Sequence, residues 1–396
     1  MVKDIRSRLP ENLRIFVGDI GRWWGYVFYR RFFKKKFLAL FPAIRYLFRG
    51  YKKEKRILGI WNFAVTPPTI GVFLEFEMRL LCMSYLNNSC KIDLAFVYDS
   101  NKSVVGPKYE SWVNASNFQY HFGEMYPMVN ILPRLGSVFL FDSHDKFESY
   151  YLDNEDKYIA HSTFFEYVND ANSRPNIPFV RDFYLQEKFI PKFEFKTATI
   201  NWARAFVKKH IGDNYMIVVS LRHNHAYSSH RNSALDEWKK FFEHCLDKKQ
   251  GIVFVVLGRQ NEVKGIKNVL GDLPNVTYSL VENPNIEQNL ALIELSLMYM
   301  ATVFGPASLP TLTNYIPFIV TNYENPEREY DYKWLKKGGQ YPWQNLETQC
   351  LVWERENADI LIKKFEDIFS KVDKEGWKRK LNLMEVEESS LEWPYN

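Results

Sequence analysis

The sequence predicts an α/β fold with two domains, each built on a mainly parallel sheet. The chain has 396 residues, which exceeds the ~250 to 300 residues at which a single hydrophobic core stops growing. Hydrophobic residues make up 46% and charged residues 25%, as in an ordinary folded protein. From Lys55 onward, short apolar runs alternate with longer amphipathic runs, which is the pattern of βα units.

The N-terminal half of this pattern begins with a strand that leads into a long helix. We expect strands at 56–63, 91–99 and 137–144, and a helix at 71–88. Residues 153–195 lack clear periodicity and contain several prolines, which favours an irregular connection that includes the domain boundary.

The C-terminal half repeats the alternation more regularly. We expect strands at 215–221, 251–258, 275–281, 301–305, 317–322 and 349–355, and helices at 197–212, 234–249, 285–300, 357–372 and from Ser308. The sequence therefore predicts four parts: a basic aromatic segment at 1–54, an N-terminal domain at 55–190, a C-terminal domain at 191–375 and an acidic tail at 376–396.

The basic aromatic segment carries most of the charge asymmetry of the chain. Every charged residue from 22 to 53 is Lys or Arg, with Trp, Phe and Tyr between them. Basic amphipathic helices of this kind lie in the plane of anionic membranes, so we expect residues 22–53 to bind an anionic membrane surface. The alternative is that these aromatic side chains pack on the body of the protein. No nucleic-acid-binding module follows the segment, and we expect no nucleic-acid partner.

The cysteines and the absence of long apolar runs predict the cellular compartment of the protein. The four cysteines form no C-x-x-C pair and no zinc spacing, and no signal peptide is visible, which favours free thiols in a reducing cytosol. No run of ~18 uncharged apolar residues is present, so a transmembrane helix is not expected. We therefore expect a cytoplasmic protein that associates peripherally with the inner face of the membrane.

Polar residues directly follow the strand expected at 215–221, in the stretch VVSLRHNHAYSSHRNS. Ligands of open parallel sheets bind beyond the carboxyl ends of the strands, and Arg222 is the first polar side chain there. A guanidinium at this place can hold a phosphate with two hydrogen bonds. His223, His225 and His230 have no nearby acid or cysteine to complete a metal site, which leaves hydrogen bonding to a ligand or a polar loop.

A second strand end, in ATVFGPASLPTLTNYIPFIVTN (301–322), combines a glycine with a helix start. Gly305 allows close approach of the backbone, Ser308 is a candidate cap of the helix, and free N–H groups at a helix start favour an anion such as phosphate. The same residues are also common as structural punctuation between a strand and a helix.

The order of a helix rich in Leu, Ile and Glu, a strand, the motif G-P-x-S, a short helix and P-F-I-V resembles the donor half of GT-B glycosyltransferases, especially heptosyltransferase-type and fucosyltransferase-type enzymes. The resemblance covers residues 197–372, and residues 55–150 by architecture alone. It implies two Rossmann-like domains that face each other across a cleft, an N-terminal one for the acceptor and a C-terminal one for the nucleotide-sugar donor.

The resemblance also implies roles for individual residues of the donor half. Residues Gly305 to Ser308 match the phosphate-facing turn, and Arg222 matches the strand-end arginine that fucosyltransferase-type enzymes direct at the donor diphosphate. His223 and Arg231 are expected to assist Arg222, while Arg259 and Glu282 match positions of base and ribose contacts. Many fucosyltransferases have paired arginines followed by Asp in place of SLRHNHAYSSHRNS, so the resemblance does not imply GDP-fucose.

The function expected from these features is glycosyl transfer from a nucleotide-activated donor to a glycan or glycolipid in cell-surface polysaccharide or lipopolysaccharide synthesis. An inverting enzyme needs a base for the acceptor hydroxyl. The N-terminal half offers Asp99, Asp142 and His144, then Glu75 and Glu77; strand-end carboxylates also serve as helix caps. No D-x-D motif is visible, so we expect neither metal nor cofactor beyond the co-substrate.

Two other functions remain open from the sequence. One is transfer from a CMP-linked acid sugar such as Kdo, because that donor is also anionic. The other is a non-catalytic protein of the same fold that binds a nucleotide or a sugar. A dehydrogenase is disfavoured because no G-x-G-x-x-G follows the first expected strand.

Overall fold

The computed structural model describes residues 55–64, 66–89, 91–98, 114, 116–162, 176–224, 229–248, 251–303, 305–324, 335–382 and 388–391. Residues 55–396 form one compact unit. The predicted membrane segment 22–53, Asp99 and His225 lie outside the described residues. Within the described ranges, no helix is both long enough and apolar enough to span a bilayer.

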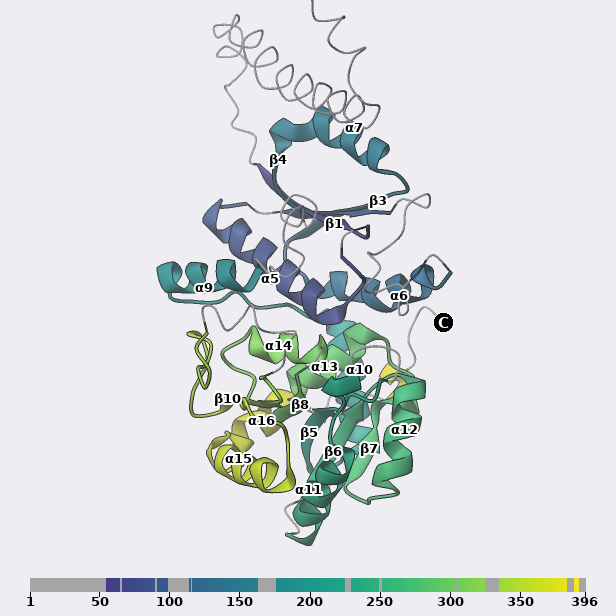
Figure 1. The fold of residues 1–396 in the computed structure, drawn as a ribbon, viewed down its shortest axis with the longest axis vertical. Coiled ribbons are helices and arrows are strands. Elements are labelled where there is room, and N and C mark those ends of the chain that lie inside the picture. The colour runs from purple at the N-terminus through teal and green to yellow at the C-terminus, as the bar shows by residue number, and fades with distance from the viewer. Residues whose placement is uncertain are drawn as a thin grey trace, which may run out of the picture. The chain divides into compact units, whose positions relative to one another are not determined.

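The first half of this unit is a four-stranded sheet in the order β3-β2-β1-β4, and all its strand pairs are parallel. The strands are β1 (Arg56–Asn62), β2 (Ile92–Val97), β3 (Leu135–Phe141) and β4 (Tyr158–Ser162). The helices are α5 (Ile70–Leu86), α6 (Phe118–Met125), α7 (His144–Asn154) and α9 (Asn176–Glu187), with a 3-10 turn η3 (Tyr126–Ile131). Helix α7 lies on one side of the sheet, and α5, α6 and α9 lie on the other (Figure 1).

The second half is a six-stranded parallel sheet in the order β10-β9-β8-β5-β6-β7. The strands are β5 (Tyr215–Ser220), β6 (Ile252–Leu257), β7 (Val276–Tyr278), β8 (Met298–Thr302), β9 (Phe318–Thr321) and β10 (Gln349–Leu351). The helices are α10 (Thr197–His210), α11 (Leu235–Asp247), α12 (Gln260–Leu270), α13 (Ile286–Leu295), α14 (Ser308–Thr311), α15 (Ala358–Lys371) and α16 (Lys374–Leu381). The predicted α/β fold with two parallel sheets is therefore confirmed.

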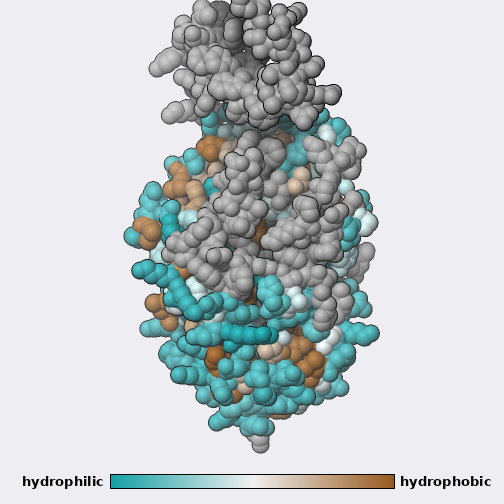
Figure 2. Space-filling view, viewed as in Figure 1, coloured by the Kyte–Doolittle hydropathy of each residue, from teal (hydrophilic) through white to brown (hydrophobic). Residues whose placement is uncertain are grey.

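Amphipathic helices explain how the second sheet is covered. Helix α11 buries Trp238, Phe241 and Phe242, and α15 buries Leu361 and Phe365. Rings of the two helices meet, because Phe241 and Phe365 have centroids 5.3 Å apart. On the face shown in Figure 2, the described surface is mainly hydrophilic with scattered hydrophobic residues. The apolar side chains of these helices thus lie inside, and their polar faces meet solvent.

Two predictions about secondary structure are wrong. Residues 153–195 are not an irregular connection, because β4 and α9 lie there. The helix expected at 285–300 ends at Leu295, and the next strand begins at Met298 rather than at residue 301. Ser296 ends the helix, and its hydroxyl donates to the carbonyl of Ile293 at 2.8 Å. The run from Leu295 to Met300 is continuously apolar apart from this serine, so periodicity cannot separate a helix end from a strand start.

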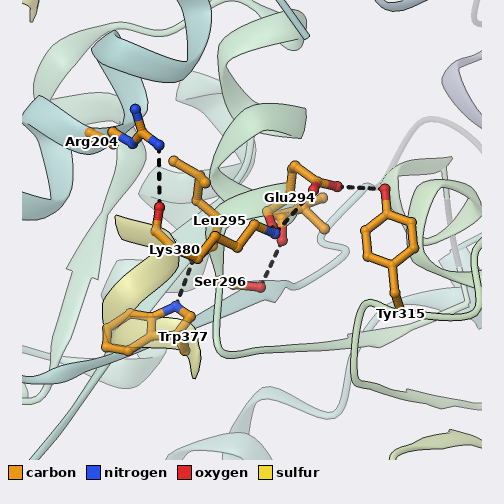
Figure 3. Close-up of polar contacts among 8 residues, drawn as sticks. Arg204, Glu294, Leu295, Ser296, Tyr315, Trp377 and Lys380 are labelled. Atoms are coloured by element: carbon orange, nitrogen blue, oxygen red, sulfur yellow. Dashed lines mark hydrogen bonds and ion pairs between the residues drawn. The ribbon is translucent and has the colours of Figure 1, made fainter. Parts of the chain in front are cut away.

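The C-terminal helix α16 is fastened to the second half by polar contacts (Figure 3). The indole N–H of Trp377 donates to the carbonyl of Leu295 at 2.8 Å. The guanidinium of Arg204 donates to the carbonyl of Lys380 at 3.2 Å. Residue 376, at which the sequence predicts the start of an acidic tail, lies inside this anchored helix.

Helix α5 carries a carboxyl group in an apolar setting. Glu77 is fully buried, as are its helix neighbours Phe73, Leu74 and Leu81. Neither carboxyl oxygen of Glu77 has a hydrogen-bond partner among the residues that the structure describes. Burial raises the pKa of Glu77 well above its ordinary value of 4.5, because an apolar environment disfavours the ionised form. Glu77 is therefore a source of pH-dependent instability.

We expect replacement of Glu77 to stabilise the protein increasingly as the pH rises. The folded-state pKa is raised, so above about pH 4.5 the unfolded chain ionises while the folded chain retains the proton. Wild-type stability is therefore lost at ~1.4 kcal/mol per pH unit, up to the folded-state pKa. Glu77→Gln keeps the shape and removes the titration. Denaturant unfolding at pH 5, 6.5 and 8 should show a widening gap between the variant and the wild type; parallel pH profiles would contradict this account.

Candidate functional site

The carboxyl ends of three neighbouring strands meet at one edge of the six-stranded sheet. Strand β5 pairs with β8 on one side and with β6 on the other, in parallel. Arg222 lies two residues beyond β5, Arg259 two residues beyond β6, and Gly305 three residues beyond β8. Parallel pairing therefore brings these three predicted site residues to the same edge of the sheet.

Arg222 is held by the loop that follows it. Its side chain is buried, and Nη1 donates to Oδ1 of Asn232 at 3.1 Å. The backbone N–H of Arg222 donates to the hydroxyl of Ser233 at 3.0 Å, and the Ser233 N–H donates back to the Arg222 carbonyl at 2.9 Å. Asn232 also accepts a hydrogen bond from the N–H of Asn224 at 2.9 Å. The loop thus turns back on the end of β5 and fixes the arginine.

Arg231 connects the loops that follow β5 and β8. Its Nη2 donates to the carbonyl of Val303 at 2.8 Å, directly before the turn that contains Gly305. This contact holds the two strand-end loops together. The structure thus places Arg231 between Arg222 and the turn, as a link between the loops.

The start of α12 adds a carboxyl group that sequence reasoning missed. Arg259 is the N-cap residue of α12, and Glu262 lies in the first turn of the helix. Burial raises the pKa of Glu262, and the guanidinium groups of Arg259 and Arg222 oppose this rise. Glu262 therefore lies within the electrostatic influence of both arginines. The only signal in the sequence is an acid three residues after an N-cap, which is common in helices.

His223 lies against the same helix. A Cβ atom added to Gly265 would come within 2.7 Å of Nε2 of His223, so the imidazole rests where a larger residue would stand. The glycine at 265 thus makes room for the histidine. His223 therefore belongs to the group that contains Arg222, Arg259 and Glu262. Among the described residues, no group of three or more His, Cys, Asp or Glu side chains can hold a metal ion.

Glu282 lies elsewhere. Burial raises its pKa, but hydrogen bonds from Lys209 (2.9 Å) and His210 (2.6 Å) outweigh this, and the pKa is lowered. Both partners are at the C-terminal end of α10, shortly before β5 begins, whereas Arg222 follows the end of β5. The structure thus does not bring Glu282 to the strand-end group.

The turn after β8 contacts the first half of the molecule. Residues Gly305–Ala307 form a 3-10 turn, and Ser308 is the first residue of α14. The prediction that Ser308 caps this helix is wrong, because the N-cap residue is Ala307 and no side-chain cap is formed. A Cβ atom on Gly71 would lie 2.9 Å from Oγ of Ser308 and 3.3 Å from Cα of Gly305. The start of α5 and the turn therefore meet through two glycines.

The candidate bases of the first half lie in different environments. Asp142 follows β3, is exposed, and pairs with Lys146 at 2.7 Å; the hydrogen bond from Lys146 lowers its pKa. Ser143 caps α7 and His144 is its first residue, so Asp142 is not the cap. Glu75 is buried in α5, and so is Glu77, which lies two residues later in the same helix. Of the described candidates, Asp142 is the one exposed carboxylate at a strand end.

Among the described residues, polar contacts also join the halves, and two of them involve carboxylates of the site region. Arg259 of the second half pairs with Glu124 of α6, with Nη2 and Oε2 2.7 Å apart. Asn130 of η3 donates to Oε2 of Glu287 in α13 at 2.8 Å, and Thr199 donates to the other oxygen of the same carboxylate at 2.5 Å. These contacts join α6 and η3 of the first half to the strand-end loops and to α13 of the second half.

Comparison with known proteins finds similar structures at low sequence identity. No family model and no curated protein matches this chain. Escherichia coli ADP-heptose lipopolysaccharide heptosyltransferase II is 8% identical, over 80% of this chain and 99% of that chain, with a TM-score of 0.49. A family 9 glycosyltransferase from Veillonella parvula DSM 2008 is 10% identical, over 85% and 97%, with a TM-score of 0.47.

A third similar structure is a UDP-GlcNAc 2-epimerase from Neisseria meningitidis bound to UDP-GlcNAc. It is 11% identical, over 85% of this chain and 96% of that chain, with a TM-score of 0.38.

We expect Gly71→Ala to destabilise the contact between α5 and the turn. The added methyl group must displace Ser308 or the backbone of Gly305, at a cost of about 1–3 kcal/mol. Gly123→Ala is the matched control, because Gly123 lies in α6 with no atom within 4 Å of an added Cβ; alanine there should be neutral or stabilise by up to ~1 kcal/mol. Denaturant unfolding of both variants checks this. Equal stability of the two would show that the glycine contact is unimportant.

Proposed function

We propose that this chain is a glycosyltransferase that moves a sugar from a nucleotide-activated donor to a glycan or glycolipid acceptor in cell-surface polysaccharide or lipopolysaccharide synthesis. The observation that carries the proposal is the position of Arg222. This arginine is buried at the carboxyl end of the central strand of a parallel sheet, where such sheets bind ligands. An anionic donor would explain why a cation is kept at that place.

In this proposal the strand-end group binds the donor diphosphate and ribose. Arg222 donates hydrogen bonds to the diphosphate and stabilises the negative charge that develops on the leaving phosphate. The backbone of Gly305 to Ser308 faces the same charge. Arg259 and His223 supply further donors, and Glu262 accepts hydrogen bonds from hydroxyl groups of the ribose. Gly71 rests against the turn in the structure, so a phosphate at the turn requires this contact to open.

The acceptor side is assigned to the first half. Asp142 is ionised at neutral pH because its pKa is lowered, and it is our candidate for the base that takes the proton of the acceptor hydroxyl. Asp99 and His144 remain alternatives for this role. The proposed reaction uses a nucleotide sugar as co-substrate and no resident metal or cofactor. A CMP-linked acid sugar such as Kdo is the second choice of donor, and a non-catalytic nucleotide- or sugar-binding protein is the alternative of another class.

We expect nucleotides to bind the wild type and to bind far more weakly when Arg222 is replaced. Arg222→Lys keeps the charge but loses the planar fork, and loss of one charged hydrogen bond should weaken binding about tenfold or more. Thermal shift with ADP, GDP, UDP, CMP and their sugar derivatives measures this. Arg379→Ala, at an exposed position of α16, is the control and should bind as the wild type does.

Three outcomes of this panel separate the hypotheses. If no nucleotide raises the melting temperature of the wild type, the donor site is refuted. If Arg222→Lys and a second variant, Arg222→Ala, both fold and bind normally, the phosphate lies elsewhere. Slow hydrolysis of the bound nucleotide sugar, measured as free nucleotide, distinguishes a transferase from a protein that only binds the nucleotide sugar.

We also propose that residues 22–53 bind the protein to the anionic inner face of the membrane, as a cytoplasmic peripheral protein. The support is the composition of the segment, in which basic residues alternate with Trp, Phe and Tyr. Full-length protein should float with liposomes that contain anionic lipid, and the chain from Lys55 to Asn396, a compact unit by itself, should not. Added salt should weaken the binding of the full chain. Equal flotation of both chains would refute the role of this segment.

A further inference from the structure

The ion pair between Arg259 and Glu124 joins a predicted donor-site cation to a carboxylate from the other half of the molecule. We propose that Glu124 occupies the place of the donor's anionic group on Arg259, so that the donor must displace Glu124 to bind. This inference rests on the proposed function, because it names an internal competitor for the same site. It makes donor binding and this contact between the halves mutually exclusive.

Glu124 is held by elements of its own half. Helix α6 is fixed by Phe118 and Phe122, whose rings lie 4.7 Å and 5.4 Å from that of Phe63. The hydroxyl of Tyr120 donates to Oε1 of Glu124 at 2.7 Å, while Oε2 lies 2.7 Å from Nη2 of Arg259 and 3.8 Å from Nδ1 of His121. The carboxylate is therefore presented to the arginine by a packed helix, as a ligand carboxylate or phosphate would be.

The charges around Arg259 favour a donor that replaces Glu124 over a donor that binds while Glu124 stays in place. Arg222 and Arg259 are positively charged, and the carboxylates of Glu124 and Glu262 offset that charge to the extent that they are ionised. Burial is the first cause of the raised pKa of Glu262, and Glu124 raises it further. A diphosphate is attracted less strongly while the carboxylate of Glu124 offsets Arg259 than after Glu124 has moved away.

The contacts of Glu287 and Glu124 between the halves differ in how readily each can be replaced by a ligand. Glu287 is buried, and its carboxylate is satisfied by Asn130 and Thr199; breaking such a contact leaves a buried charge without partners. The side chains of Arg259 and Glu124 are 30% and 28% exposed, so this pair is less buried than Glu287 and costs less to break. The contact made by Glu287 therefore persists in this proposal, whereas a ligand can replace Glu124 on Arg259.

The test uses full-length protein and four variants. These are Glu124→Gln, Arg259→Gln, the double variant, and Asp182→Asn, which removes a distant exposed acid. The probes are ADP, GDP, UDP, CMP and inorganic pyrophosphate, and binding is measured by calorimetry. Glu124→Gln should tighten binding of the preferred probe about two- to fivefold, the range expected for a partly exposed pair. Arg259→Gln should weaken it, and Glu124→Gln should have no effect in the Arg259→Gln background.

A second measurement in the absence of ligand makes the test independent of the nucleotide. Melting temperatures of the wild type, Glu124→Gln, Arg259→Gln and the double variant should show positive coupling between Glu124 and Arg259, and its absence would overturn the ion pair itself. Unchanged or weaker binding by Glu124→Gln, in a protein that binds a probe, would overturn the exchange alone. Failure of the wild type and of Glu124→Gln to bind any probe, with coupling present, would refute the proposed function and the exchange with it. Asp182→Asn should bind as the wild type does.

Discussion

The central position of β5 in the six-stranded sheet is the constraint on which the rest of the site depends. The strand pairs with a parallel neighbour on each side, so its backbone N–H and C=O groups serve the two ladders. Its side chains from Met216 to Ser220 are buried. Polar chemistry can therefore begin only beyond the strand, and the parallel order places the ends of β6 and β8 beside it. Residues far apart in the sequence, such as Arg222 and Gly305, become neighbours for this reason.

A buried arginine at such a place requires an explanation beyond stability. Removing a guanidinium from water costs free energy unless it is paired and hydrogen-bonded, and apolar replacements of buried ionic groups are often as stable. Arg222 has the amide of Asn232 as a neutral partner and the carboxyl of Glu262 in its field. The loop from Ser229 to Ser233 holds this side chain through Asn232 and connects to the loop after β8 through Arg231. An anionic ligand is the simplest reason for a chain to maintain that loop.

Local patterns made most of the fold predictable, and tertiary contacts account for the rest. Continuous apolar runs such as YMIVVS indicated strands, and the stripe of Trp238, Phe241 and Phe242 indicated α11. Helix α12 is absent from the prediction although Val263, Ile266 and Leu270 are buried at helical spacing, because Gly265 in its middle lowers the helical signal. Arg222 and Arg259 could be selected from strand ends alone. Glu262 and Glu124 could not, since their importance arises from arginines that approach them in space.

The contacts between the halves suggest why the site is electrically balanced without a ligand. Two arginines at one sheet edge repel each other, and a charged surface of this kind would hold the halves apart. Glu124 and Glu262 remove this repulsion, so the two halves can meet at the Gly71 contact while no donor is bound. A phosphate carries the same sign as Glu124 and can take over its role on Arg259. In the proposed exchange, the same arginine would bind a carboxylate of the chain in one arrangement and the donor in the other.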